Sequence, residues 1–224
     1  MERIAKTRLT RRQLQKAALA LPAPLALALV GGRTAGIAFA QESATPPTDA
    51  TPVLAPTPAC GDDDDLDTTL QQTEGPYFTP NSPERTSLLD PSMPGTKLVV
   101  TGYVYSTDCR PVEKALLEFW HCDDAGVYDN VGYTLRGHQF TNKDGRYELT
   151  TILPGIYTGR TRHIHVKVQA PDQPVLTSQL YFPDEPENAR DGIYDPSLEM
   201  DLQDAPEENE GKVGFFTFVL DLAD

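Results

Sequence analysis

The chain has 224 residues, which is enough for one ordinary domain with additional segments. Its formal net charge is −14 at pH 7, from 33 acidic and 19 basic residues. Such an acidic surface repels nucleic acid and anionic membranes, so we expect neither as a partner.

The first 40 residues have the composition of an export signal. A basic stretch at 1–16 precedes an apolar run at 17–30, and the small-residue sequence Ala38-Phe39-Ala40 closes the segment. The apolar run is short for a membrane-spanning helix, although an uncleaved anchor is the alternative. Arg11 and Arg12 fit a twin-arginine signal, the type used by proteins exported after folding. We therefore expect a signal at 1–40, an extracellular or cell-envelope location, and no stable membrane insertion after cleavage.

Residues 41–66 have the composition of a linker. Positions 41–59 are rich in Pro, Thr, Ala and Ser, and 62–65 are four consecutive aspartates. A calcium site at the aspartates is the alternative to a simple solvated charge run. Seven basic residues and one acidic residue precede position 41, so a mature chain would carry 12 basic and 32 acidic residues, a net charge of −20. We expect order to begin near Thr73 and one catalytic domain to occupy 67–224.

The chain has three cysteines, Cys60, Cys109 and Cys122. Export permits a disulfide, and the odd number leaves one cysteine over. Cys109 lies in an expected turn, whereas Cys122 lies past the far end of the following strand. A bridge between these two is therefore disfavoured. Cys60 is expected to pair with one of them, and the sequence leaves open which one.

From Lys97 onward, short strands alternate with turn residues, and no window has a convincing helical period. The expected strands are 98–105, 115–120, 146–152, 163–169, 176–182 and 213–220. The expected turns are 108–111, 144–145 and 154–155. We interpret 115–120 as the strand that returns from 98–105. The pattern predicts an all-β fold, a β-sandwich with long functional loops.

His163 and His165 point to the same face of their expected strand, because side chains alternate with period two. Imidazole binds iron, copper, zinc and nickel alike, so this pair does not select a metal. Tyr128 and Tyr157 would complete a set of four ligands. A phenol has a reference pKa of about 10, so holding two phenolates near neutral pH requires a strongly Lewis-acidic cation such as ferric iron.

Each of these residues also has a purely structural interpretation. A His-x-His pair on a strand is often solvent-facing, and either tyrosine alone could simply pack. His121 and His138 are interpreted as packing or supporting residues. The metal hypothesis depends on Tyr128, Tyr157 and the histidine pair occurring together in one short domain.

Several sequence motifs occur between Thr73 and Phe182. They are Thr-Glu-Gly-Pro-Tyr-Phe at 73–78, Glu-Phe-Trp-His-Cys-Asp-Asp-Ala-Gly-Val-Tyr at 118–128, Leu-Arg-Gly at 135–137, Thr-Asn-Lys-Asp-Gly-Arg-Tyr at 141–147, Pro-Gly-Ile-Tyr at 154–157, Arg-Thr-Arg-His-Ile-His at 160–165 and Gln-Leu-Tyr-Phe at 179–182. Together they resemble the intradiol ring-cleavage dioxygenases of the catechol and protocatechuate type. The signal and linker favour a secreted branch of that family.

The resemblance implies an intradiol dioxygenase/prealbumin-like β-sandwich. It also implies an enzyme that uses O2 to cleave catechol-type diols between the two hydroxyls, giving muconate-type diacids. The implied cofactor is non-haem Fe(3+), with Tyr128 and His165 as equatorial ligands and Tyr157 and His163 as axial ligands. Tyr157 would also accept a substrate proton and leave the iron.

The resemblance implies further roles in catalysis. Arg160 would stabilise charge developing on the ring, and Gln179 would help to orient the reacting group. The sequence Arg160-Thr161-Arg162-His163 departs from the Arg-Pro-x-His of better-known members. Register favours Arg160 for this role, and Arg162 is the competing residue. The segment from Tyr157 to His163 is also shorter, so substrate preference does not transfer.

Four residues would line the substrate cleft by the same resemblance: Gly75, Pro76, Tyr77 and Trp120. Two other functions compete with the dioxygenase. A non-catalytic transthyretin-like binding module explains the turns but gives no reason for His-Ile-His with Arg160. A zinc or copper hydrolase would lack an evident carboxylate base near the histidines. The sequence leaves open the physiological catechol and whether the chain forms a homo-oligomer.

Overall fold

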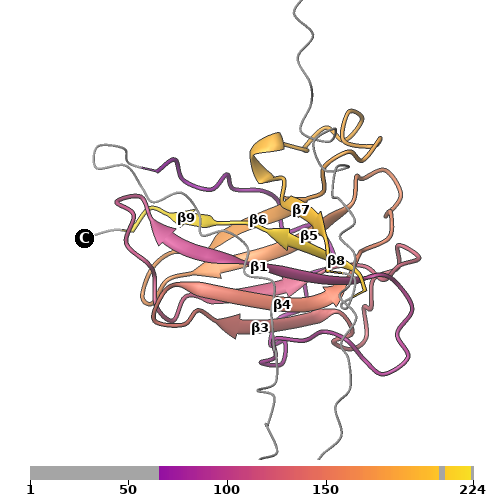
Figure 1. Cartoon of the computed structure of the whole chain (residues 1–224), viewed down its shortest axis with the longest axis horizontal. Helices are drawn as coiled ribbons and strands as arrows, with labels where there is room; N and C mark the ends of the chain where they lie inside the picture. The colour runs from indigo at the N-terminus through magenta and orange to yellow at the C-terminus, as the bar shows by residue number, and fades with distance from the viewer. Residues whose placement is uncertain (1–65, 207–209, 223–224) are drawn as a thin grey trace, which may run out of the picture. The chain divides into compact units, whose positions relative to one another are not determined.

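The computed structural model describes residues 66–206 and 210–222, so the predicted signal and nearly all of the predicted linker lie outside the described residues. The described part is built of strands, which form two sheets (Figure 1). The elements are β1 (Lys97–Ser106), β2 (Leu116–Trp120), β3 (Arg136–Phe140), β4 (Arg146–Ile152), β5 (His163–Gln169), β6 (Leu176–Tyr181), the 3-10 helix η2 (Pro196–Leu198), β7 (Asp201–Asp204), β8 (Lys212–Phe215) and β9 (Phe218–Leu220). No helix in these described ranges has the length and apolarity that a membrane crossing requires.

The two sheets enclose one apolar core, as the β-sandwich prediction expects. One sheet has the order β4-β1-β8-β7, with β9 also pairing with β1, and the other has the order β3-β2-β5-β6. Ile164, Val166 and Val168 on β5 are fully buried in the core, together with Leu117 and Phe119 on β2. These apolar positions alternate along their strands, so the remaining side chains of β5 face the outside of the second sheet.

Strand β2 does not return along β1, contrary to the sequence prediction. β1 pairs antiparallel with β4, whereas β2 pairs with β3 and β5 in the other sheet. A tight turn does follow β1, where the amide of Val112 donates to the carbonyl of Val104, but the chain then crosses to the second sheet. The alternation of β2 requires only that one face be buried, and either sheet can satisfy that requirement.

The predicted strand 213–220 is divided into β8 and β9, with Phe216 at the break. A Cβ atom on Gly102 of β1 would lie 1.8 Å from the carbonyl oxygen of Phe216, so the chain passes very close to β1 here. The Tyr147 hydroxyl donates to that same oxygen at 2.9 Å. Because a side chain occupies this acceptor, the strand ladder is interrupted at Phe216.

Strands β3 and β7 were missed by the sequence prediction. β3 reads Arg-Gly-His-Gln-Phe and β7 reads Asp-Leu-Gln-Asp, and neither has the apolar alternation that identified the other strands. Both lie at sheet edges. Edge strands need less apolar surface, which is why their composition gives a weak signal.

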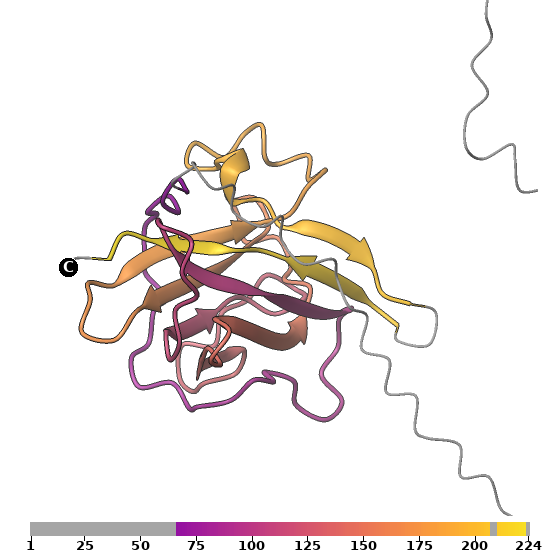
Figure 2. The same ribbon diagram turned by 60° about the vertical axis from the view of Figure 1, so that its left-hand side comes forward.

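The described structure includes hydrogen-bonded residues before the expected start near Thr73. Leu66, the last residue of the predicted linker, donates its amide to Thr107 O, and the amide of Thr69 donates to Val219 O. The amide of Gln72 then donates to Thr177 O on β6. Figure 2 shows the purple segment that precedes β1 running around the outside of the sandwich.

The cysteines agree with the expectation that Cys109 and Cys122 do not bridge each other. Cys109 takes part in a disulfide, whereas Cys122 is free and buried. Burial raises the pKa of the Cys122 thiol to about 11, which keeps it protonated and unreactive. Cys60 lies outside the described residues.

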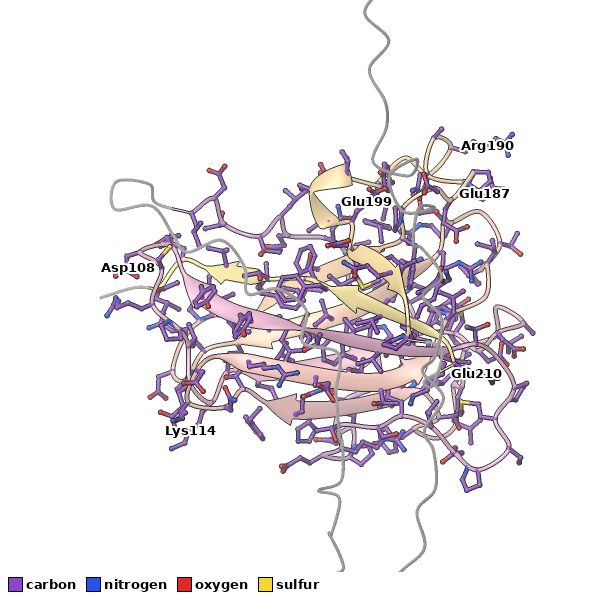
Figure 3. The ribbon with its side chains drawn as sticks, in the orientation of Figure 1. Asp108, Lys114, Glu187, Arg190, Glu199 and Glu210 are labelled. Atoms are coloured by element: carbon purple, nitrogen blue, oxygen red, sulfur yellow. The ribbon has the colours of Figure 1, made fainter. Side chains whose placement is uncertain are left out.

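A long loop between β6 and β7 lies at the opposite end of the sandwich from the turn after β1. In Figure 3, Asp108 marks that turn, and Glu187, Arg190 and Glu199 mark the loop. Glu199 fixes the loop internally, because its carboxylate accepts from Tyr194 Oη at 2.6 Å and from Asn188 Nδ2 at 3.2 Å. The same loop supports the segment that precedes β5, because Thr161 donates to Asn188 and to Asp191.

Candidate active site

One row of side chains crosses the outer face of the second sheet. Trp120 on β2 is in register with Arg136 on β3 and with His165 on β5, and His165 is in register with Gln179 on β6. Residues directly opposite each other on neighbouring strands share a face. All four are almost completely buried, so loops cover this face. Three of the four, Arg136, His165 and Gln179, are polar, and packing alone gives no reason to bury them.

Three proposed ligand atoms converge beside this row. The Nε2 atoms of His163 and His165 lie 3.2 Å apart, and the Tyr128 hydroxyl lies 3.3 Å from Nε2 of His163. Two donor atoms that each lie about 2.1 Å from one ion, at angles of about 90–110°, are about 3.0–3.4 Å apart. Both separations, from Nε2 of His163 to His165 and to Tyr128, are therefore those of ligands that share one metal ion.

The tautomer of His163 agrees with metal binding. Its Nδ1 lies 2.6 Å from the carbonyl oxygen of Thr161, which can only accept, so Nδ1 carries the proton. Its Nε2 then presents a lone pair toward His165 and Tyr128. Burial lowers the pKa of His163 to about 4, and burial followed by the charge of His163 holds the pKa of His165 well below its usual value. Both imidazoles are thus neutral at pH 7, which is the form that binds metals.

The two tyrosine-bearing loops touch through glycines. A Cβ atom on Gly126 would lie 2.4 Å from the carbonyl oxygen of Ile156, and one on Gly155 would lie 2.4 Å from the amide nitrogen of Gly126. The amide of Gly155 donates to Asp123 O at 2.7 Å. Only residues without a side chain permit this approach. The contact places Tyr128 and Tyr157 side by side, with ring centroids 5.8 Å apart.

Tyr157 is tied to Tyr77 rather than to the histidines. The two hydroxyls lie 2.8 Å apart, and this hydrogen bond is the main cause that raises the pKa of Tyr77. The Tyr77 ring also stacks on Tyr128, with centroids 4.5 Å apart. Burial raises the pKa of the Tyr128 phenol, so without a cation that phenol stays protonated.

Arg160 and Arg162 face different surroundings. Arg160 donates from Nη2 to Gln179 Oε1 at 2.7 Å and from Nε to Asp191 at 2.8 Å. Its charge is also among the causes that lower the pKa values of His163 and His165, after burial. Arg162 instead pairs with Glu185 at 2.5 Å and donates to the carbonyl of Pro154. Arg160 is therefore the guanidinium that adjoins the buried row.

Arg136 is a functional candidate that the sequence reasoning did not single out. It is 1% exposed and donates to the carbonyl of Tyr77 at 2.6 Å and, from Nε and Nη2, to that of Asp129 at 3.0 and 2.6 Å. One buried guanidinium thus joins the segments that carry Tyr77 and Tyr128. Arg136 lies in one of the sequence motifs that carry the family resemblance, but only the fold shows that the Arg136 side chain is buried.

The expected cleft residues differ in their contacts. Trp120 stacks on the His165 ring, with centroids 4.9 Å apart and an interplanar angle of 4°. A Cβ atom on Gly75 would lie 3.3 Å from Cε1 of His165, so this glycine also packs against the imidazole. Pro76 is exposed. The segment 73–78 therefore covers the proposed ligands.

The two remaining histidines of the described chain have partners away from the ligand atoms. His121 is buried, with Nδ1 2.7 Å from Cys122 O and Nε2 2.7 Å from the Thr151 hydroxyl. His138 lies 3.3 Å from the Ser82 hydroxyl. Within residues 66–206 and 210–222, no three His, Cys, Asp or Glu side chains are grouped to hold a metal. Among the described side chains with a contact to the histidine pair, Tyr128 is therefore the candidate for a further ligand.

Comparison with known proteins places this site in context. A family model described as "Dioxygenase" matches residues 73–220. The dioxygenase domain of a dioxygenase carbohydrate-binding protein fusion from Streptomyces sp. SirexAA-E is 55% identical, with a TM-score of 0.68 over 70% of this chain and 100% of that one. The 3-chlorocatechol 1,2-dioxygenase of Rhodococcus opacus is 25% identical, with a TM-score of 0.63 over 69% of this chain and 73% of that one.

A curated relative gives the same family at lower coverage. The catechol 1,2-dioxygenase of Candida albicans is 28% identical over 148 residues, which is 54% of this chain and 49% of the relative. The chain spans about half the length of the curated relatives that it matches.

Proposed function

Because the chain belongs to the intradiol ring-cleavage dioxygenase family, we propose that it cleaves catechol-type diols between the two hydroxyl-bearing carbons. The reaction consumes one O2, and both oxygen atoms enter the product, a muconate-type diacid. The observation that carries the proposal is the convergence of the Tyr128 hydroxyl with Nε2 of His163 and of His165. A non-catalytic binding module gives no reason for a phenol hydroxyl and a second imidazole within 3.3 Å of Nε2 of His163.

We propose Tyr128, Tyr157, His163 and His165 as the residues that hold a non-haem ferric ion. A set of two nitrogen and two phenol oxygen donors suits a hard, oxidised cation better than the softer ions that favour thiolates. Bound there, ferric iron would supply Lewis acidity, withdrawing electron density from a catechol held through its oxygens so that a ring carbon reacts with O2. The spacing of the three converging donors supports this assignment.

The remaining roles belong to the chain's own groups. As a phenolate, Tyr157 would take a proton from a substrate hydroxyl, and the 2.8 Å contact of its oxygen with Tyr77, an expected cleft residue, supports this role. Arg160 supplies a fixed positive charge beside the row, and Gln179 holds that guanidinium in place. Gln179 in turn donates to Thr73 O at 2.9 Å, which links Arg160 to the segment that covers the ligands.

A zinc or copper hydrolase is the less favoured function. Nucleophilic water at such a site needs a general base within hydrogen-bond reach. Asp191 is the carboxylate that contacts Arg160. It is bonded to the Arg160 guanidinium and to the Thr161 amide. Both partners stabilise the charged carboxylate and reduce its tendency to take a proton.

Colour, metal content and oxygen uptake test the proposal together. Protein purified from iron-replete cells should be red-brown, because ferric tyrosinate absorbs visible light by charge transfer, and should contain about one iron per chain. Catechol, chlorocatechol, hydroxyquinol and protocatechuate should be offered while oxygen uptake and products are followed. A colourless, iron-free preparation, or a product cleaved beside rather than between the hydroxyls, would rule the proposal out.

We further propose that residues 1–40 direct export by the twin-arginine route and that 41–65 tether the domain. The motif around Arg11 and Arg12 and the composition that follows it support this proposal. Replacing both arginines by lysine should retain the protein in the cytoplasm of a host that has this route, and fractionation with N-terminal sequencing would measure it. Continued export of the double variant would contradict the assignment.

A further inference from the structure

His165 differs from the other buried histidines in how its ring is held. Metal-binding histidines almost always donate their second ring N–H to a protein acceptor, which fixes the orientation of the ring. His163 has such a partner in Thr161 O. Nδ1 of His165 is buried and has no hydrogen-bond partner in the described part of the chain. Apart from the 3.2 Å contact of its Nε2 with His163, this imidazole is therefore oriented by packing.

The packing that holds His165 is aromatic. Its ring lies parallel to that of Trp120, at 4.9 Å and 4°. Phe78 meets the same indole edge-on, with centroids 4.9 Å apart and an interplanar angle of 61°. The indole Nε1 is also buried without a partner in the described residues, so no hydrogen bond fixes this stack from its far end. The position of the stack therefore depends on the contacts that hold Phe78 against Trp120.

Lys167 occupies that position. It follows His165 by two residues on β5, so it points to the same outer face. Its Nζ lies 3.4 Å above the centroid of the Phe78 ring and 2.5 Å from the carboxylate of Glu74. An ammonium over an aromatic face is attracted by the ring quadrupole, and more strongly when partly desolvated. The Lys167 side chain is only 19% exposed.

We propose that Lys167, Glu74 and Phe78 form a clamp that holds the segment 73–78 against Trp120 and thereby fixes the ring of His165. Lys167 is a positioning residue and touches neither substrate nor metal. The clamp joins strand β5 to the segment that carries Gly75, which contacts His165, and Tyr77, which is bonded to Tyr157. Its effect on the metal rests on the proposed function, whereas its effect on the stack does not.

The fluorescence of Trp120 tests the clamp without any metal. The chain has a single tryptophan, so emission from the iron-free protein reports on this stack alone. Lys167→Met keeps the apolar stem but removes the charge, whereas Lys167→Arg keeps both. Lys212→Met is the matched control, because Lys212 pairs with Asp204 at 2.8 Å on a strand of the other sheet. We expect a red shift and greater quenching by acrylamide in Lys167→Met, and wild-type emission in the other two.

Metal retention and substrate binding then test the consequence. Competition with a chelator should show that Lys167→Met binds iron about 10-fold more weakly than the wild type. Losses of this size are found when a residue that orients a metal ligand is replaced. The KM for catechol should rise more than kcat per bound iron falls, because Tyr77 is displaced with the segment. Lys167→Arg should restore both values.

The outcomes separate the clamp from the proposed function. If Lys167→Met lowers the thermal midpoint but leaves Trp120 emission, iron affinity and KM unchanged, Lys167 is an ordinary surface ion pair and the clamp is refuted. If wild-type protein binds no iron yet its Trp120 emission still responds to Lys167→Met, the clamp stands and the proposed dioxygenase function fails.

Discussion

Replacing Arg160 by alanine is expected to lower kcat by about 100- to 1,000-fold, the loss found when one fixed donor to a developing charge is removed. Iron content and visible colour should persist, because Arg160 contacts Gln179 and Asp191 and none of the proposed ligand atoms. The measurement is turnover of catechol per bound iron, with the visible spectrum recorded on the same sample. Asp191 would lose its cationic partner and keep only the backbone amides of Thr161 and Ile193, so the variant should also unfold more easily.

Two further variants separate catalysis from that loss of stability. Asp191→Asn keeps the shape of the side chain but removes the ion pair with Arg160. It should therefore lower stability as Arg160→Ala does, with a much smaller effect on kcat. Arg162→Ala removes the neighbouring guanidinium, which pairs with Glu185. We expect Arg162→Ala to retain most of the activity. A large loss in Arg162→Ala with a small loss in Arg160→Ala would reverse the assignment.

The choice between these two arginines illustrates what the sequence leaves undetermined. Both lie within three residues of His163, and although register favours Arg160, the local pattern leaves Arg162 as a competitor. Their surroundings differ through acidic residues more than 20 positions away, Asp191 for Arg160 and Glu185 for Arg162. Contacts of such separation depend on how the loop after β6 folds back, and no local periodicity encodes that path.

The parts of the fold that followed local rules were predicted well. The alternation on β5 correctly placed Ile164, Val166 and Val168 in the core and the histidines on the opposite face. Pairing between strands was not predictable in the same way, because the burial pattern of β1 fits a neighbour in either sheet. Arg136 shows the same limit. Arginine is usually exposed, so the sequence gives no sign that this side chain is buried, and only its acceptors Tyr77 O and Asp129 O explain the burial.

The tyrosines were recognised as a pair, but their different environments appear only in the fold. Tyr128 is 7% exposed and its hydroxyl adjoins His163, whereas Tyr157 is partly exposed and its hydroxyl adjoins Tyr77. The structure also shows which histidine variant makes a sound control for the loss of a proposed ligand. His121→Ala would leave Thr151 and the carbonyl of Cys122 without a partner in the core, so His138→Ala, on the edge strand β3, is the cleaner choice.

Tyr128→Phe is expected to remove most of the visible absorption and to weaken iron retention by at least about 100-fold, since losing a ligand should exceed the loss of a supporting partner. The phenylalanine ring can keep the stack on Tyr77, so the fold should survive. The measurements are the visible spectrum, iron per chain and the thermal midpoint. Tyr133→Phe is the matched control, because its hydroxyl donates to Pro80 O near the surface.

Tyr157→Phe should differ from Tyr128→Phe in a defined way. The hydroxyl it loses is bonded to Tyr77, and Tyr157 is the less buried residue, so iron should be retained better than in Tyr128→Phe while the band shifts and turnover falls. A wild-type spectrum in Tyr128→Phe would remove that residue from the ligand set. Identical spectra and iron contents in the two variants would show that the tyrosines are equivalent, which their different burial and partners argue against. The contrast between the variants thus tests whether a buried phenol holds the metal while an accessible one is free to exchange a proton with the substrate.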